Sequence, residues 1–215
     1  MDLEKRQILR GSGLTEQVFR RIRADIMSLR LQPGAKISVH DLVQELGVSQ
    51  TPVREALSML EANGLVVKTH LIGYVTAPRM DRTQLDELFE FRLLVEPYGA
   101  HKAARTMAQS EIERLSELLV APSASQDAFG DMDAAFHSLI AQGSGNHLIA
   151  EALRRLHIHV HIFRSSFGAE IAEEAMLEHG AVIKAITARN GRDAEAAMRR
   201  HLQKTHRRLR GFIKD

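Results

Sequence analysis

The sequence predicts a mainly α-helical protein made of two units: a small N-terminal unit with short helices and a β-hairpin, and a larger all-helical C-terminal unit. Up to Pro78, short apolar stripes of helical spacing alternate with turn residues and end in two short apolar runs. After Pro78 the stripes become long and purely helical. A chain of 215 residues with 44% hydrophobic content can bury two small cores.

The first helix is predicted over residues 16–29, because apolar side chains recur there at three- and four-residue spacing. These side chains are Val18, Ile22, Ile26 and Leu29. Pro33 and Gly34 follow closely and mark a turn, so the helix is expected to end before them.

Two further short helices are predicted from their capping residues. Ser38 stands three residues before Asp41, an arrangement that resembles a capping box, and Gly47 ends the helix that it starts. Ser49 is expected to cap the next helix, which ends at Gly64. The apolar residues expected to point inward are Leu42, Val43, Leu46, Val53, Leu57 and Leu60.

Residues 65–68 and 73–77 are two apolar runs joined by a short connection, which indicates a β-hairpin. The order of helix, short helix, turn, helix and hairpin is that of a winged helix-turn-helix. In that arrangement the second helix of the pair enters the DNA major groove, and here it begins with the stretch SQTPVREAL at Ser49.

The second half reads as helices separated by polar or glycine-containing breaks, with no internal repeat. The predicted helical segments are 82–105, 110–120, 127–142, 147–167, 172–190 and 192–212. They predict an all-α, antiparallel helical bundle.

The stretch LHIHVHIFR, residues 156–164, allows two interpretations. A strand would place His157, His159 and His161 on one face as a metal site, whereas a helix separates His159 from the other two. The preceding AEALRRL is rich in strong helix formers, and an isolated strand would lack a partner. We therefore expect a helix.

The amino-acid composition limits the classes of function that the protein can have. A net charge of +2 is too small to indicate nucleic-acid binding by itself. The absence of cysteine excludes disulfides and thiolate metal sites, so any metal must be held by imidazole and carboxylate groups. No apolar run approaches the length of a membrane helix and the N-terminus lacks a signal-peptide core, which makes a cytoplasmic location the default expectation and a membrane partner unexpected.

Four residues are candidate metal ligands. Asp133 and His137 lie at i and i+4 on one predicted helix, and His179 and His201 lie beside the apolar stripes of two others. Three histidines and one carboxylate suit Zn, Mn, Fe or Ni, with zinc the first expectation. The alternative is that these histidines are solvated or hydrogen-bonded.

Longer motifs carry a family resemblance. The segment PGAKISVHDLVQELGVSQTPVREALSMLEANGLV, followed by Gly73, resembles the DNA-binding domain of GntR-family transcription regulators. The motifs FRLLVEP, DMDAAFH, LEHGAVIKAI and AAMRRHL resemble the FCD ligand-binding domain of the FadR subfamily. The resemblance covers residues 14–212 and implies a homodimeric repressor or activator that binds double-stranded operator DNA, with a repressor as the first expectation. It also implies a small effector, commonly a carboxylic acid, that binds near a divalent metal held by Asp133, His137, His179 and His201.

The resemblance also implies which residues meet DNA. Arg54 matches the arginine of the PVRE motif that is expected to reach DNA, and an ion pair with Glu55 or Glu61 on a solvated face is its alternative. Gln50 departs from the arginine of many relatives and is suited to adenine rather than guanine, and His40 also stands where arginine is frequent. Ser49 and Thr51 are expected to cap the helix and touch phosphate. Ser38 and Gly73 complete the candidate DNA-binding set.

Three residues are candidate effector contacts. Arg92 resembles a position that meets an effector carboxylate through two hydrogen bonds, and an ion pair with Glu96, four residues on, is the alternative. His161 and Arg164 are expected to line the same cavity, with a packed or surface role as their alternative.

These expectations give a two-domain regulator. Residues 1–13 form a flexible arm, 14–78 the DNA-binding domain, 79–81 a linker and 82–215 the effector- and metal-binding domain. A regulator that responds to metal alone ranks second. A metal-dependent hydrolase ranks third, because no evident general base accompanies the four ligands and an enzyme leaves the winged helix unexplained.

Overall fold

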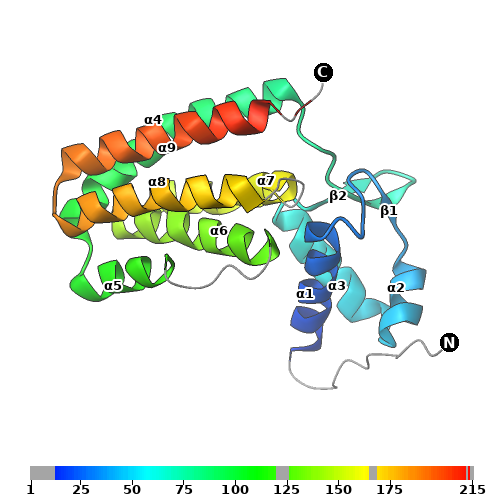
Figure 1. Ribbon diagram of the computed structural model, residues 1–215. Helices are drawn as coiled ribbons and strands as arrows, with labels where there is room; N and C mark the ends of the chain where they lie inside the picture. Colours follow the sequence, from blue (N-terminus) through cyan, green and yellow to red (C-terminus); the bar gives the residue numbers. More distant parts are fainter. Residues whose placement is uncertain (1–12, 120–125, 165–168, 212, 214–215) are drawn as a thin grey trace. The chain divides into compact units, whose positions relative to one another are not determined.

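The computed structural model of the protein describes residues 13–119, 126–164, 169–211 and 213. The side chains of residues 126–128, 157–164 and 169–171 lie outside this description. The chain divides into two compact units, residues 1–79 and 80–215, and helices dominate both (Figure 1). The mainly α-helical fold class is thereby confirmed.

The N-terminal unit contains three helices and a small sheet. The helices are α1 (Leu14–Met27), α2 (Val39–Leu46) and α3 (Gln50–Ala62), and the strands are β1 (Lys36–Ile37), β2 (Val66–Thr69) and β3 (Gly73–Thr76). The strand order is β1-β3-β2, and both pairings are antiparallel. This is the predicted winged helix-turn-helix with one additional strand, since β1 is too short to show an alternating pattern in the sequence.

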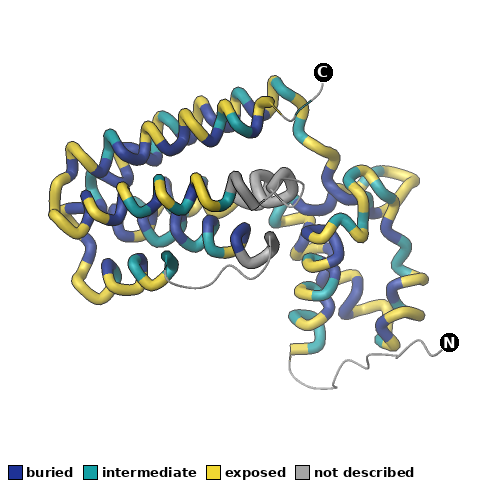
Figure 2. Tube along the Cα trace, in the orientation of Figure 1, coloured by how far each residue is buried: buried dark blue, intermediate teal, exposed yellow. Residues whose placement is uncertain are grey.

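The core of this unit lies where α1, α2 and the sheet meet α3. Val18 and Ile22 of α1 and Val53 and Leu57 of α3 have no exposed surface. The opposite side of α3 is exposed, as the alternation of dark blue and yellow along the helix shows (Figure 2). The amphipathic stripe of α3 therefore fixes which of its side chains remain available for a partner.

Local signals determine several helix ends. Ser38 accepts a hydrogen bond from the backbone N–H of Asp41 at 3.2 Å and caps α2, and Gly47 ends that helix in the left-handed conformation with φ of 66°. The first helix ends at Met27 rather than at the predicted Leu29. Leu29 has φ of +57°, and Leu31 N–H bonds back to Asp25 O at 2.8 Å, so the chain turns away two residues early.

The C-terminal unit consists of helices throughout its described residues. They are α4 (Arg82–Thr106), α5 (Gln109–Glu117), α6 (Gln126–Gly143), α7 (His147–Arg164), α8 (Ala169–Thr187) and α9 (Gly191–Arg210). The two longest helices, α4 and α9, run side by side and antiparallel (Figure 1): Asp86 near the start of α4 contacts His206 near the end of α9, and His101 near the end of α4 contacts Glu195 near the start of α9. Helix α8 packs against α9, and α6 packs against α4 and α7.

The stretch at residues 156–164 continues α7, which confirms the helical interpretation. His157, His159 and His161 therefore do not share a strand face. Their side chains, and that of Arg164, lie outside the described part of the structure, as do residues 1–12 of the expected N-terminal arm. Among the described residues, no helix is long and apolar enough to cross a membrane.

Candidate metal centre and nucleic-acid interface

The structure brings the four predicted metal ligands together inside the helical unit. Helix α6 contributes Asp133 and His137, α8 contributes His179 and α9 contributes His201. One ligand atom from each lies within 4.8 Å of the others, and all four residues are buried. The i, i+4 spacing on α6 supplies half of the cluster locally, and packing of α8 and α9 supplies the rest.

The polar atoms of the cluster point at one another. His179 Nε2 lies 3.3 Å from Asp133 Oδ1, and His137 Nε2 lies 3.3 Å from His201 Nε2. Phe136 stacks on the ring of His179, with centroids 3.8 Å apart, and closes one side with apolar surface. Water is therefore largely excluded from the converging atoms.

A carboxylate stands behind each of two histidines. His137 Nδ1 lies 2.5 Å from Glu96 Oε2, and His201 Nδ1 lies 2.9 Å from Glu178 Oε2. This hydrogen-bond network assigns a proton to each Nδ1 atom and leaves each Nε2 atom as an electron-pair donor. Carboxylates in this position are typical of metal-binding histidines, because they fix the tautomer and orient the ring.

The facing Nε2 atoms provide a test of whether a cation fits. Two unprotonated imidazole nitrogens 3.3 Å apart repel each other, and a cation bound by both of them would remove this repulsion. Three imidazole nitrogens with one carboxylate oxygen form the donor set of Zn²⁺ and related ions. The residues therefore fit a divalent cation.

The pKa values support a neutral His201 and an ionised Glu178. Burial lowers the pKa of His201 to about 3 against the opposing hydrogen bond to Glu178, and the neighbouring His179 and His137 lower it further. Burial acts to raise the pKa of Glu178, but hydrogen bonds with Arg208 and His201 outweigh it and hold the value at about 2. Near neutral pH, His201 is therefore in the metal-binding form and Glu178 carries its charge.

Arg92 lies beside the cluster and has no exposed surface. Its Nε atom lies 2.5 Å from Glu96 Oε1, so the ion pair considered from the sequence is present. Its Nη2 atom lies 3.3 Å from His137 Nε2. Arg92 is thus in a position to meet a ligand at the cluster, although Glu96 already engages one edge of its guanidinium.

The candidate DNA-contacting residues gather at the start of α3 and on neighbouring segments. Gln50, Thr51 and Arg54 are all exposed on the first two turns of α3. Among the described residues, Arg54 has no ion-pair partner, and the neighbouring Glu55 instead accepts a hydrogen bond from Thr15 at 2.7 Å. A pairing of Arg54 with Glu55, which would have made it a surface bridge, is not formed.

The other candidates occupy the turn before α3, helix α2 and the hairpin. Ser49 is the N-cap residue of α3 but makes no capping hydrogen bond through its side chain, so its hydroxyl and the first N–H groups are available to phosphate. His40 is exposed on α2 beside Asp41. Gly73 begins β3 with φ of 96°, a backbone conformation that favours glycine.

Comparisons with known proteins agree with this geometry. The model of bacterial regulatory proteins of the gntR family matches residues 14–74, and the model of the FCD domain matches residues 87–204. The chain belongs to the GntR family, in the branch that carries an FCD domain. It is therefore a DNA-binding transcriptional regulator and not an enzyme, which sets the hydrolase alternative aside.

Individual family members resemble it along most of their length. The transcriptional regulator LutR of Bacillus subtilis is 29% identical over 211 residues, covering 86% of this chain and 96% of LutR. The repressor RspR of Escherichia coli is 27% identical, covering 92% and 89%. Among solved structures, a GntR regulator from Rhodococcus sp. RHA1 superposes with a TM-score of 0.77 at 22% identity, covering 94% of this chain and all of that one.

Glu178 and Arg208 are site residues that the sequence did not reveal. Glu178 adjoins His179 in the sequence but serves His201 on the next helix. Arg208 holds Glu178 with two hydrogen bonds of 2.7 and 2.8 Å. No spacing rule along one helix links these partners, because the contacts cross between α8 and α9.

The carboxylate behind His201 offers a direct test of the metal centre. Glu178→Gln is expected to lower zinc affinity by about 10- to 100-fold, because the imidazole loses the charge that orients it and raises its basicity. Competition with a fluorescent zinc chelator would measure the change.

Glu174→Gln is the matched control, since Glu174 also pairs with Arg208 but is not a hydrogen-bond partner of His201. Circular dichroism would verify the fold of both variants. Equal zinc affinity in the two variants would remove Glu178 from the site.

Proposed function

We propose that this regulator binds a two-fold operator as a homodimer and that its helical unit binds a divalent cation, with zinc first in expectation, together with a small carboxylate effector. The effector would alter operator affinity. The observation that carries the proposal is the buried convergence of Asp133, His137, His179 and His201 beside the guanidinium of Arg92.

The donor set supports the cation. Three imidazoles and one carboxylate suit zinc, and nickel, manganese and iron accept the same donors. When bound, the metal supplies a positive centre that attracts a carboxylate ligand. Glu96 and Glu178 orient His137 and His201 for this purpose, and the stacked ring of Phe136 keeps the site dry.

Arg92 supports the carboxylate effector. Its Nη1 atom is buried and makes no hydrogen bond to any residue that the structure describes. A buried guanidinium donor without a partner is costly, and a carboxylate is the group that best satisfies it. Arg92 is therefore the leading effector contact, while His161 and Arg164 remain proposed contacts on α7.

The second candidate is a regulator for which the metal alone is the signal or a structural clamp. The observation in its favour is the pairing of Arg92 with Glu96, which already compensates the buried charge of the guanidinium. In this case metal would control operator affinity without any organic ligand.

The exposed N-terminal part of α3 supports base recognition by this helix in the DNA major groove. Arg54 and Gln50 lie one turn apart on the exposed face, which suits contacts with base edges in the major groove. Ser49 and Thr51 suit phosphate contacts, and Ser38, His40 and Gly73 would position α2 and the wing against the backbone. A bacterial operator lies in the cytoplasm, which supports the expected cytoplasmic location.

An apolar patch on α4 supports the homodimer. It consists of Phe91, Leu94 and Tyr98, which recur at i, i+3 and i+7 and therefore lie on one side of the helix, and Leu94 is 72% exposed. A second copy of the chain would cover the patch and provide the two-fold axis that a palindromic operator requires.

Regulation then requires the effector to bind one arrangement of the dimer more tightly than another. A coupling of about 1–3 kcal/mol between the two sites gives a usable response. The name of RspR, a repressor, supports repression as the sign of control in this chain also.

Arg54→Ala is expected to weaken specific DNA binding by at least about tenfold, since one good base contact is worth roughly 1–3 kcal/mol. The probe is a duplex selected by the wild-type protein from a random pool, and footprinting gives the affinity. Arg20→Ala is the control, because Arg20 is an exposed arginine of α1 that pairs with Glu16. Retained footprints with Arg54→Ala would refute its role.

Leu94→Glu is expected to turn the dimer into a monomer, because a charge would be buried at the centre of the apolar patch. Light scattering coupled to size-exclusion chromatography would report the mass. Leu177→Glu is the control, since Leu177 is 75% exposed on α8, outside the patch. A dimer that survives Leu94→Glu would place the interface elsewhere.

The effector can be sought by thermal unfolding of metal-stripped and metal-restored protein with a panel of small carboxylic acids. An acid at 100 times its Kd adds about 2.7 kcal/mol of stability, and we expect this only in the metal-loaded form. Arg92→Lys should abolish the gain, because lysine keeps the charge but lacks the planar fork. Stabilisation by metal alone, with no acid adding to it, would favour the metal-responsive alternative.

A further inference from the structure

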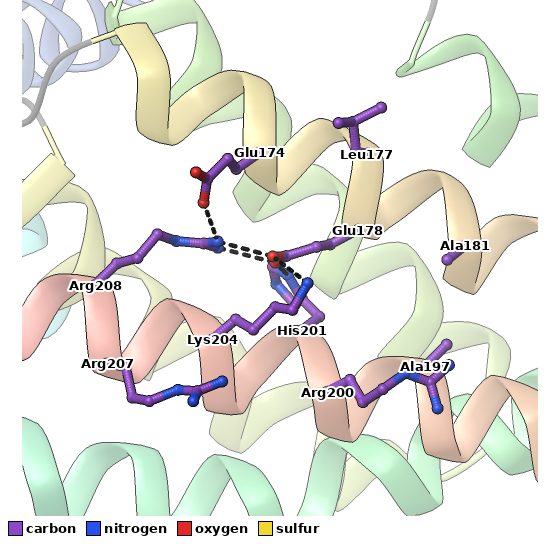
Figure 3. Close-up of a pocket in the computed structure, with 10 residues that line it drawn as sticks. All are labelled: Glu174, Leu177, Glu178, Ala181, Ala197, Arg200, His201, Lys204, Arg207 and Arg208. Atoms are coloured by element: carbon purple, nitrogen blue, oxygen red, sulfur yellow. Dashed lines mark hydrogen bonds and ion pairs between the residues drawn. The ribbon is translucent and has the colours of Figure 1, made fainter.

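A groove of about 550 Å³ lies between α8 and α9, and its lining includes Glu178 and the metal ligand His201 (Figure 3). Ala181 and Ala197 leave it hollow, because neither side chain reaches across the space between the helices. His201 contributes only its edge, as it is 1% exposed. The proposed effector contact Arg92 is not among its lining residues, so His201 is the one residue that the groove shares with the proposed effector site.

The walls of the groove are rich in charge. Its charged lining residues, apart from His201, are Glu174, Glu178, Arg200, Lys204, Arg207 and Arg208. On α9 the basic positions follow one another at i, i+4, i+7 and i+8, so a single helix face carries all four. Four cations face two carboxylates, which leaves the groove positive.

The four basic side chains differ in the ion pairs that they form. Arg208 is engaged by both Glu174 and Glu178 at 2.7–2.8 Å, and Lys204 Nζ lies 3.7 Å from Glu178 Oε1. Arg200 and Arg207 form no ion pair with any residue in the described part of the chain, and both extend along the rim of the groove (Figure 3). The guanidiniums of Arg200 and Arg207 are therefore available at the groove, and the ammonium of Lys204 is held only by its 3.7 Å contact with Glu178.

We propose that this groove is a second ligand site, which binds a small anion carrying at least two negative charges. The ligand is a polycarboxylate or a phosphorylated molecule. Guanidinium groups bind carboxylate and phosphate oxygens through paired hydrogen bonds, and Lys204 adds a third positive charge. The site goes beyond the proposed effector site, since none of its anion-binding groups is a metal ligand.

The position of Glu178 gives the second site a consequence for the first. Arg208 and Lys204 contact the carboxylate that orients His201. An anion that draws either cation toward itself changes the charge that His201 experiences. Ligand binding in the groove is thus linked to the metal centre through one shared residue.

The proposal is tested by isothermal titration calorimetry on the full-length, zinc-loaded protein at constant ionic strength. Inorganic phosphate is the probe for a phosphoryl ligand and tricarballylate the probe for a polycarboxylate, and acetate serves as the monoanion control. Saturable binding of at least one probe, and none of acetate, is expected. The tighter of the two probes identifies the chemical source of the ligand.

The double variant Arg200→Gln, Arg207→Gln is expected to weaken that binding by about tenfold or more, because it removes both available guanidiniums. The matched control is Arg192→Gln, Arg199→Gln, which removes the same charge from exposed positions of α9 outside the groove and should change affinity less than twofold. Binding should persist after zinc is removed with a chelator.

The proposal would be overturned if neither probe gave saturable heat. It would also be overturned by equal weakening in the two double variants, because that result would indicate only the general positive electrostatic field of α9. Binding that disappears with zinc while the groove variant binds normally would place the anion at the metal. Weaker operator binding by the groove variant with unchanged probe affinity would instead assign the groove to DNA phosphates.

Discussion

The helical unit is organised around two imidazole–carboxylate hydrogen bonds, the buried pair His137 with Glu96 and the partly buried pair His201 with Glu178. Charged groups this deep in a protein destabilise it unless each has a partner. Here Arg92 compensates Glu96, and Arg208 compensates Glu178. The two arginines therefore compensate the carboxylates at the edge of the cluster, and the ligand atoms of its four residues converge within 4.8 Å of one another.

This constraint explains the packing of the long helices. Helix α4 must lie against α6 to bring Glu96 to His137, and α9 must lie against α8 to bring His201 to Glu178. The surrounding core is apolar, with Leu85, Phe89 and Leu202 fully buried. The polar cluster thus selects one register of helix packing among the several that an apolar core alone would accept.

The N-terminal unit is stabilised in a different way. Its core depends on apolar stripes such as Val18 with Ile22, and the residues proposed to read DNA lie on the surface with few contacts of their own. Their chemistry needs only exposure and the fixed direction of α3, which the buried face of that helix provides. The candidate metal centre and α3 thus belong to different cores.

By itself the sequence determined what depends on near neighbours. The cap at Ser38, the stop at Gly47 and the pairing of Asp133 with His137 follow from spacings of three to six residues along the chain. The winged helix and the helical half were predictable for the same reason, and the family motifs joined His179 and His201 to the set. Strand β1 was not predicted, because a strand of two residues is too short to show an alternating apolar pattern.

Only the tertiary structure decided which partners each charged side chain acquired. Arg92 had two possible partners by sequence, and the fold placed Glu96 against it and His137 beside it. Glu178 and Arg208 became a pair because α8 and α9 lie side by side, and the groove with Arg200 and Arg207 arises from the same contact. The Glu178–Arg208 hydrogen bonds join positions 30 residues apart, so their geometry is set by helix packing and not by any local period of the chain.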